Sequence, residues 1–262
     1  MYNMQAVVRK SINNATMQFE RLGYVANNLA NYNTVGYKTS SFEQLMREDG
    51  YVDGAIRRNT LQGSIRVSKN PYDIAISGEG YIPVVSPDGE IQYTRDGSLK
   101  RGQNGYLLTV DDWMVGDGIK IPANSYKFEI RPNGDVMNYD DKGSLPEKIG
   151  TIPIVQFDNP EALEQGHNNK VVYNNETGDP FLIKDPNSIR QYATEVSNVN
   201  IHDELNTMMR LNASMIASLN DTLAVLENDS TYKNADENKK FEIIQGKLNS
   251  ENAEVFKSLP VM

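Results

Sequence analysis

Two stretches of helical periodicity, one near each end of the chain, place the strongest constraint on the fold. Near the N-terminus, apolar side chains recur by steps of three and four residues after the first, at Val8, Ile12, Ala15, Phe19, Leu22, Ala26 and Leu29. Near the other end, a second stripe holds Leu205, Met209, Ile216, Leu219, Leu223 and Leu226. Such spacing lines one face of an α-helix, and a stripe this narrow needs a partner helix to cover it. We therefore expect the two terminal helices to pair as a coiled-coil-like unit.

Between the two stripes, the pattern changes to short β-type runs separated by turn-forming residues. The runs lie at residues 72–77, 81–85, 91–95, 106–110, 127–131, 136–139 and 149–157. Pro-Asp-Gly at 87–89, Gln-Asn-Gly at 103–105 and Pro-Asn-Gly at 132–134 fit hairpin connections, which favours sequential antiparallel pairing. The predicted class is α+β, with an antiparallel, mainly-β central domain between N- and C-terminal α-helices.

Shifts in pattern divide the chain into five expected segments. An N-terminal helix occupies residues 1–36, and an extended connector follows at 37–70, with a short helix expected at 41–47. The β domain spans 71–191, and the C-terminal helix lies within 192–227. A polar break opens residues 228–262, which form a C-terminal extension.

Charge and composition exclude several classes of protein. There are 26 Lys and Arg against 35 Asp and Glu, a net charge of −9, which argues against a nucleic-acid binder because such a protein needs a basic face. Cysteine is absent, and the only two histidines are His167 and His202. The sequence therefore has too few of the residues from which disulfides, zinc sites and catalytic triads are formed. We expect no enzymatic activity, no cofactor, no metal site and no nucleic-acid partner.

Targeting signals are equally sparse. No run of about 18 apolar residues is present, so no membrane insertion is expected. The first residues lack the basic start, apolar stretch and cleavage site of a secretory signal. Export, where it occurs, is expected without a cleaved signal peptide.

The candidate motifs favour turns over chemistry. Gly78–Gly80 and Gly116–Gly118 lack the spacing of a phosphate-binding loop and flank β-type sequence, so tight turns are the preferred interpretation. In the acidic pairs Asp111–Asp112 and Asp140–Asp141, adjacent side chains point to opposite faces of a strand and do not converge on a cation.

Two alternatives from other functional classes stay open at this point. The single Trp113 and the 14 tyrosines would suit a secreted glycan-binding or adhesin-like β module. A carboxylate-dependent hydrolase would need two acids, such as Asp96 and Asp117, to meet in one cleft.

Four blocks of sequence, in the same order, resemble the flagellar rod, hook and hook-associated axial proteins. They are NNLANYNTVGYK at 27–38, DIAISGEGY at 73–81, YTRDGS at 93–98 and EVSNVN at 195–200. The length of the β region and the lack of a large outer insertion make the chain similar to a basal-body rod protein of the FlgF/FlgG type.

This resemblance implies a non-enzymatic structural subunit of the basal-body rod. It would self-assemble into the axial drive shaft that transmits torque from motor to hook, in the part of the flagellum that spans the periplasm. The implied partners are further copies of itself, other rod subunits, hook-side axial proteins, the flagellar type III export apparatus and the surrounding ring proteins. Its terminal helices would order on assembly to form the inner tube.

The predicted functional residues are subunit-interface residues. One group lies on the two helical stripes: Ile12, Phe19, Leu22 and Leu29 with Leu205, Ile216, Leu219 and Leu223. The other group lies at the junction after the first helix, where Asn side chains can cap backbone groups: Asn27, Asn28, Asn31 and Gly36.

Overall fold

The computed structural model describes residues 4–183, 188–227 and 234, so the expected extension at 228–262 lies outside the described residues except for Asn234. Two α-helices enclose a long series of strands, which confirms an α+β fold with a mainly-β centre. The helices are α1 (Met4–Ala30) and α2 (Ile201–Glu227). The strands are β1 (Ser40–Met46), β2 (Val52–Arg58), β3 (Ile65–Val67), β4 (Ile74–Ile76), β5 (Ile82–Val85), β6 (Ile91–Thr94), β7 (Leu99–Arg101), β8 (Leu107–Thr109), β9 (Met114–Val115), β10 (Lys127–Ile130), β11 (Asp135–Tyr139), β12 (Glu147–Thr151), β13 (Val155–Gln156), β14 (Glu164–Gln165), β15 (Lys170–Val172), β16 (Phe181–Leu182), β17 (Ile189–Gln191) and β18 (Ala193–Glu195).

The described residues form two compact units. The helical unit contains the described parts of residues 1–19, 46–52 and 209–262, and the β-rich unit contains residues 20–45 and 53–208. Each helix contributes residues to both units. Among the described residues, neither helix combines the length and the hydropathy that crossing a bilayer requires.

Both helices form where the apolar periodicity predicts them, and side chains fix their ends. At the start of α2, Asn200 Oδ1 accepts from the backbone N of His202 at 3.1 Å, and Asp203 and Glu204 place negative charge in the first turn. At the end of α1, Asn31 Nδ2 donates to the carbonyl of Asn27 at 2.9 Å. The Asn31 side chain thus adds a second hydrogen bond to the Asn27 carbonyl, which already accepts from the backbone N of Asn31 at 3.1 Å.

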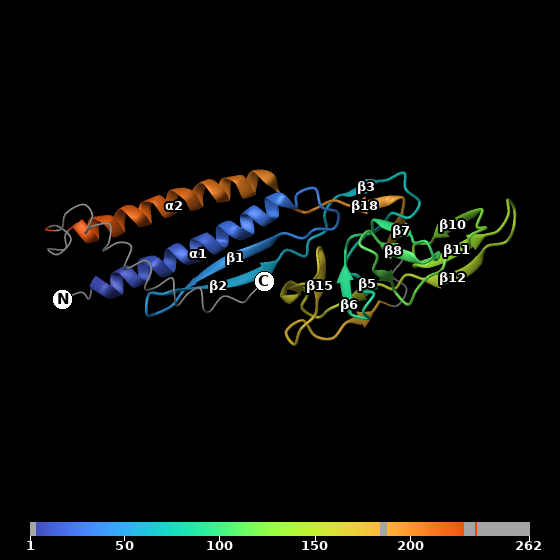
Figure 1. Ribbon diagram of the computed structural model, residues 1–262, viewed down its shortest axis with the longest axis horizontal. Coiled ribbons are helices and arrows are strands. Elements are labelled where there is room, and N and C mark those ends of the chain that lie inside the picture. Colours follow the sequence, from blue (N-terminus) through green and yellow to red (C-terminus); the bar gives the residue numbers. More distant parts are fainter. Residues whose placement is uncertain (1–3, 184–187, 228–233, 235–262) are drawn as a thin grey trace. The chain divides into compact units, whose positions relative to one another are not determined.

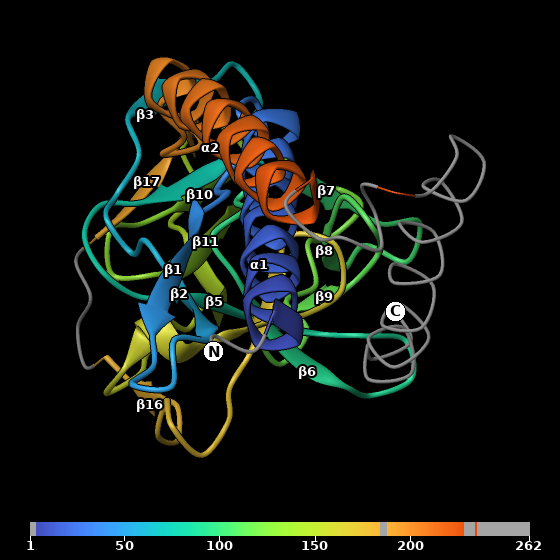
Figure 2. The same ribbon diagram turned by 90° about the vertical axis from the view of Figure 1, so that its left-hand side faces the viewer.

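Helix α1 lies next to α2 and next to the β1–β2 hairpin (Figures 1 and 2). Gln18 Nε2 donates to Ser214 Oγ on α2 at 3.1 Å. On the other side, Asn13 exchanges two hydrogen bonds with the backbone of Val52, at 3.1 and 2.7 Å. These polar contacts join α1 to α2 and to the start of β2 within the helical unit.

The helix expected at residues 41–47 is wrong, because β1 occupies Ser40–Met46. Phe42 explains the difference. Its ring is buried against Gly54 of β2, at a place where any added Cβ would lie 2.0 Å from the ring, and Tyr24 of α1 stacks on it at 5.7 Å. Packing across the hairpin overrides the local helix propensity of this segment. Residues 37–70, expected as an extended connector, hold β1, β2 and β3.

The strands of the β-rich unit pair partly in sequence and partly across the chain. Sequential antiparallel pairing is confirmed for β10-β11-β12, for β5-β6 and for β7-β8-β9, and Gly89, Gly105 and Gly134 adopt positive φ in the connections. It is wrong for β4, which pairs with β17. Two strands outside the predicted runs also pair across the chain: β3 with β18, and β15 with β6 as well as with its neighbour β14. Strands near the end of the β-rich unit therefore pair with strands near its beginning.

One main hydrophobic core stabilises the β-rich unit. Fully buried side chains from β4, β5, β8, β9, β11 and β17 meet in it, and they include Ile74, Ile76, Val84, Leu107, Val115, Val136 and Ile189. A second, aromatic cluster joins Tyr81, Tyr93 and Phe157 with ring centroids 5.0 to 5.8 Å apart. The two clusters hold the strand ends at which the functional side chains lie.

Candidate functional site

The side chain of Asn28 connects three segments at the end of α1. Its Nδ2 donates to the Ser40 carbonyl and to Glu204 Oε1 of α2, both at 2.9 Å. Its Oδ1 accepts from the Tyr37 hydroxyl at 3.0 Å and from the backbone N of Ser40 at 3.1 Å. Because both donors and both lone pairs are used, the buried amide fixes α1, β1 and the first turn of α2. Burial raises the pKa of Glu204.

The loop after α1 makes a turn that only glycine tolerates. Thr34 Oγ1 donates to Asn31 Oδ1 at 3.0 Å, which continues the cap on α1. Gly36 then adopts φ +68°, and a Cβ there would lie 2.5 Å from the carbonyl carbon of Arg95. Glycine is required both by its φ and by this close approach of two backbones.

A buried ion cluster, formed by Lys38, Arg95 and Glu195, lies just beyond this turn. Lys38 Nζ is 2.6 Å from Glu195 Oε1, and Arg95 donates through Nε and Nη2 to Glu195 Oε2 at 2.9 and 2.6 Å. The side chains are 3, 5 and 1 % exposed. Burial lowers the pKa of Lys38, and the hydrogen bond from Lys38 to Glu195 opposes that shift. One carboxylate therefore holds two cations in the interior.

Backbone groups satisfy the rest of the Glu195 cluster. Glu195 Oε1 also accepts from the backbone N of Gly63 at 2.9 Å, and the Glu195 carbonyl accepts from Gly36 N at 2.8 Å. Arg95 Nη1 donates to the carbonyls of Gly78 and Gly80 at 2.8 and 2.7 Å. Full satisfaction of this kind is what makes a buried charge tolerable.

The four sequence blocks singled out above meet at this cluster. Lys38 ends the first block, and Gly78 and Gly80 belong to the second. Arg95 belongs to the third, and Glu195 begins the fourth. The fourth block also ties back to the first, because Asn198 Oδ1 accepts from the backbone N and the hydroxyl of Thr39 at 2.8 and 2.6 Å. The blocks therefore specify one junction between the helices and the β-rich unit's core.

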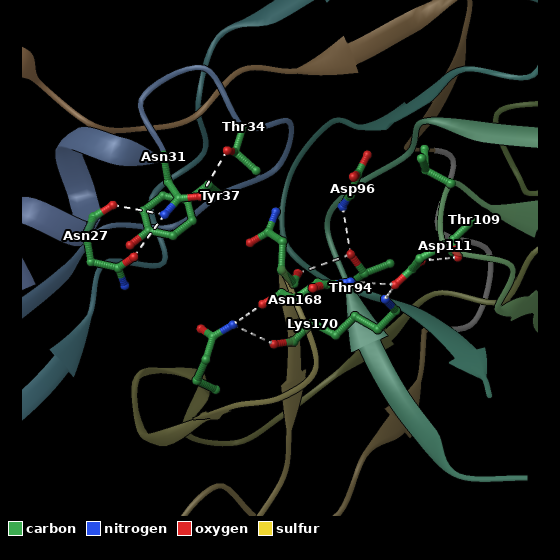
Figure 3. A pocket seen from close by; sticks show the side chains of 13 residues that line it. Asn27, Asn31, Thr34, Tyr37, Thr94, Asp96, Thr109, Asp111, Asn168 and Lys170 are labelled. Carbon is green, nitrogen blue, oxygen red and sulfur yellow. Dashed lines mark hydrogen bonds and ion pairs between the residues drawn. The ribbon is translucent and has the colours of Figure 1, made fainter. Parts of the chain in front are cut away.

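A polar pocket of about 490 Å³ lies beside the junction (Figure 3). Asn27, Asn31, Thr34 and Tyr37 line it from the end of α1 and the following loop. The remaining walls come from strands and turns of the β-rich unit, including Asp96, Asp111 and Lys170. Lys170 Nζ contacts Asp111 Oδ2 and lies 4.5 Å from the centre of the Trp113 ring.

The pKa values of the two carboxyl groups that line the pocket shift in opposite directions. Burial raises the pKa of Asp96. Burial also acts to raise the pKa of Asp111, but hydrogen bonds from Lys170, Thr109 and Asn168 outweigh it and lower that pKa to about 2. Asp111 is thus the anion that balances the buried Lys170 ammonium.

The geometry bears on both alternative readings. Asp96 shares the pocket with Asp111, whereas Asp117, the acid named with Asp96 in the hydrolase hypothesis, is exposed and is not among the lining residues. Trp113 is 7 % exposed and stacks on His167 at 5.8 Å, so it offers no open platform for a sugar. The turn interpretation of Gly78 and Gly80 is confirmed by their positive φ.

The predicted stripe on α2 lies on the exposed side of that helix. Ile216 and Leu219 are 60 and 57 % exposed, and Leu205 and Leu223 are exposed as well. Among the residues of α2 whose burial the structure describes, the buried or half-buried ones are instead Glu204, Thr207, Met208, Leu211, Met215 and Ser218, mostly one position earlier in the chain.

On α1 the offset is similar. Phe19 is 60 % exposed, whereas Gln18, Val25 and Asn28 are buried. Ile12, Leu22 and Leu29 are half-buried. Within the described residues, then, the α2 stripe is exposed, whereas the named residues of the α1 stripe are half-buried apart from Phe19.

The interface prediction did not include Lys38, Arg95 and Glu195. The sequence carries little signal for them, because Arg95 follows the β-type run Ile91–Thr94 directly and its neighbours Thr94 and Asp96 are polar. A buried charge needs a partner, but the sequence does not name it.

Comparison with known proteins supports the family that the four sequence blocks resemble. The flagellar hook protein FlgE/F/G D1 domain matches residues 75–138, and the flagella basal body rod protein family matches residues 20–38. The flagellar basal-body rod protein FlgG of Caulobacter vibrioides is 29% identical over 235 residues, covering 79% of this chain and 89% of the relative.

Two further relatives extend the comparison. FlgG of Buchnera aphidicola subsp. Schizaphis graminum is 30% identical over 217 residues, covering 72% of this chain and 84% of the relative. FlgF of Mesorhizobium japonicum is 29% identical over 198 residues, covering 71 and 79%. The chain belongs to the family of flagellar basal-body rod proteins. This membership confirms the expected class, a structural subunit of the flagellar rod.

Proposed function

We propose that the chain self-assembles into the axial drive shaft of the basal-body rod, where it carries torque from the motor to the hook. Its role is mechanical rather than catalytic. One observation carries the assembly step: the exposed apolar stripe of α2, formed by Leu205, Met209, Ile216, Leu219 and Leu223. An apolar stripe of this length on one helix face is typical of a surface that another helix covers.

The coiled-coil-like pairing of terminal helices belongs to the assembled state in this proposal. The stripe of α2, together with Phe19 of α1, would be covered by helices of neighbouring copies. A contact that repeats from copy to copy without closing produces a filament. The polar contact between Gln18 and Ser214 supports a monomer in which α1 and α2 already lie together while the α2 stripe stays exposed.

The remaining interface residues serve the junction. The direction in which the chain leaves α1 is set by Asn27, Asn28, Asn31 and Gly36. The apolar stripes therefore begin from a backbone of fixed conformation. The proposed partners are further copies, other rod subunits, hook-side axial proteins, the surrounding ring proteins and the type III export apparatus. The proposed location is the periplasm-spanning part of the basal body, reached without a cleaved signal.

The test is a charge placed on the stripe. Leu219→Asp should leave the free energy of unfolding nearly unchanged, because this side chain is 57 % exposed. The same variant should abolish rod assembly, because a buried unpaired carboxylate in the contact costs several kcal/mol. Electron microscopy of basal bodies and swimming assays, in cells whose own copy is deleted, measure the loss.

A matched control is Ala217→Asp, which adds the same charge at an exposed position of α2 outside the stripe. It should assemble and swim normally. Intact basal bodies and normal motility in the Leu219→Asp strain would contradict the proposal.

A further inference from the structure

A second pocket in the β-rich unit, of about 380 Å³, is lined by tyrosine and proline side chains and is called here the tyrosine pocket. Its lining includes Pro71, Tyr72, Pro122, Tyr126 and Tyr192. Tyr126 is 61 % and Tyr192 40 % exposed, so two of the rings are open to solvent. Tyrosine is enriched at protein interfaces because its ring gives a large apolar contact with few rotamers to fix.

The polar groups of the tyrosine pocket are cationic. Arg101 and Lys127 line it, and no carboxylate is among its lining residues. Lys127 Nζ lies 3.5 Å from Glu129 Oε2 in an exposed pair, while the Arg101 guanidinium donates to the Ile121 carbonyl at 3.2 Å. Ser125 Oγ is buried there without a hydrogen-bond partner among the described residues. The pocket therefore suits an apolar group flanked by negative charge.

The connection between β11 and β12 has the complementary character. Leu145, within this loop, is 92 % exposed, the highest value among the large apolar side chains that the structure describes. Asp140, Asp141, Lys142 and Glu147 flank it in the sequence, and all four are exposed. Lys148, which follows Glu147, pairs with Asp135 at 2.6 Å. The loop thus presents one apolar side chain within a segment of net negative charge.

The loop does not occupy the pocket of its own chain. Lys127 of the pocket pairs with Tyr139 in the β10–β11 register, so the loop leaves the sheet at the end where the pocket lies. Leu145 nevertheless stays exposed. An apolar side chain left in solvent beside an acidic flank is free to reach another molecule.

We propose that the Leu145 loop of one copy docks into the tyrosine pocket of a second copy. Leu145 enters between the rings of Tyr126 and Tyr192, and the acidic flank meets Arg101 and Lys127. Apolar anchor and charge complementarity together set the register of the contact. The inference rests on the proposed function only in that copies must meet, and it adds a contact between β-rich units to the one made by the helices.

Cysteine cross-linking tests the docking, because the full-length chain has no cysteine of its own. Ser144→Cys, next to Leu145 in the loop, in one tagged copy is mixed with Ala123→Cys, an exposed lining residue of the pocket, in a second copy with a different tag. The disulfide-linked pair is quantified after mild oxidation. The control replaces Ala123→Cys by Ile91→Cys, which is exposed and does not line the pocket. Docking should raise the yield about fivefold or more over the control, because it raises the effective concentration of the thiols.

A charge exchange provides the second arm. Adding Lys127→Glu to the pocket copy should reduce the cross-link toward the control yield, and adding Asp141→Lys to the loop copy should restore it. Equal yields for the two cysteine pairs, or no response to the charge exchange, would overturn the docking. The proposed function is tested separately, by whether basal bodies assemble in the Leu219→Asp strain.

Discussion

At the scale of single residues, the carboxylate of Glu195 stabilises two buried cations. Replacing Glu195 by Gln leaves Lys38 and Arg95 buried without a carboxylate. Breaking a buried ion pair by removing one partner typically costs about 3–5 kcal/mol, so Glu195→Gln should lower the free energy of unfolding by that amount. Urea unfolding followed by circular dichroism measures the change.

The matched control for Glu195→Gln is Glu43→Gln, which removes a carboxylate from the exposed pair with Arg57. Exposed pairs contribute about 0–1 kcal/mol. A loss in Glu195→Gln no larger than in Glu43→Gln would contradict the stabilising role of the Glu195 cluster.

Asp111 makes stability depend on pH in a defined window. Its pKa falls from 3.8 to about 2 in the folded protein, so its contribution is fully present above pH 3.8 and is lost as the pH falls toward 2. Asp111→Asn should cost about 1.5–3 kcal/mol at neutral pH, the usual value of a charge-assisted hydrogen bond. The difference between variant and wild type should shrink between pH 4 and pH 2, in urea titrations at each pH. A constant difference over that range would contradict the assignment.

The charged residues at the junction show the limit of a single sequence. The capping role of Asn31 follows from local spacing and is confirmed. The Glu195 cluster does not follow from local spacing, since Lys38 and Arg95 lie 157 and 100 residues from Glu195 along the chain. Local periodicity carries no information on contacts of that range.

At the scale of elements, α1 contains a glycine that contributes nothing to packing. Gly23 is exposed, and a Cβ added there meets nothing within 4 Å. Gly23→Ala should therefore raise the free energy of unfolding by about 0.5–1 kcal/mol through helix propensity. Thermal unfolding measures the shift. Gly36→Ala is the contrasting variant and should destabilise by about 1–3 kcal/mol, because it forces a Cβ into the Arg95 backbone at positive φ. A loss of stability in Gly23→Ala would contradict this account.

Element existence could be predicted better than element partnership. The two helices and the strands at β4, β5, β6, β8, β10, β11 and β12 lie where periodicity predicts them. On α1, Gln18 and Asn28 were missed because they are polar, and their burial depends on hydrogen bonds to Ser214, Ser40 and Glu204. A pattern based on hydropathy assigns such residues to solvent. On α2, the buried Leu211 and the half-buried Met208 and Met215 are apolar and recur at the same spacing as the predicted stripe.

At the scale of the whole molecule, stability should differ between the two units. The main core and the aromatic cluster both lie in the β-rich unit, whereas Leu211 and Val52 are the buried apolar side chains described in the helical unit. Amides of α2 from Met209 onward should exchange with deuterium about 100-fold faster than those of β4 and β11, because local opening needs less free energy where less apolar surface is buried.

Mass spectrometry of exchanged peptides measures the difference between the units. The comparison with assembled rods is the informative control, since coverage of the α2 stripe should slow its exchange. Equal protection of α2 in the free chain and in rods would contradict coverage of the stripe on assembly.

The pairing of β3 with β18 has a consequence for a load-bearing subunit. Ile65 lies opposite Glu195, so the chain segments leading to α1 and to α2 depart from the same end of this strand pair. A force that pulls the two segments apart would peel the strands open one hydrogen bond at a time, the direction in which paired strands resist least. The Glu195 cluster lies at that fork and joins both sides through Lys38, Gly36 and Gly63. The contacts of the Glu195 cluster must therefore break before the hydrogen bonds between β3 and β18 can open.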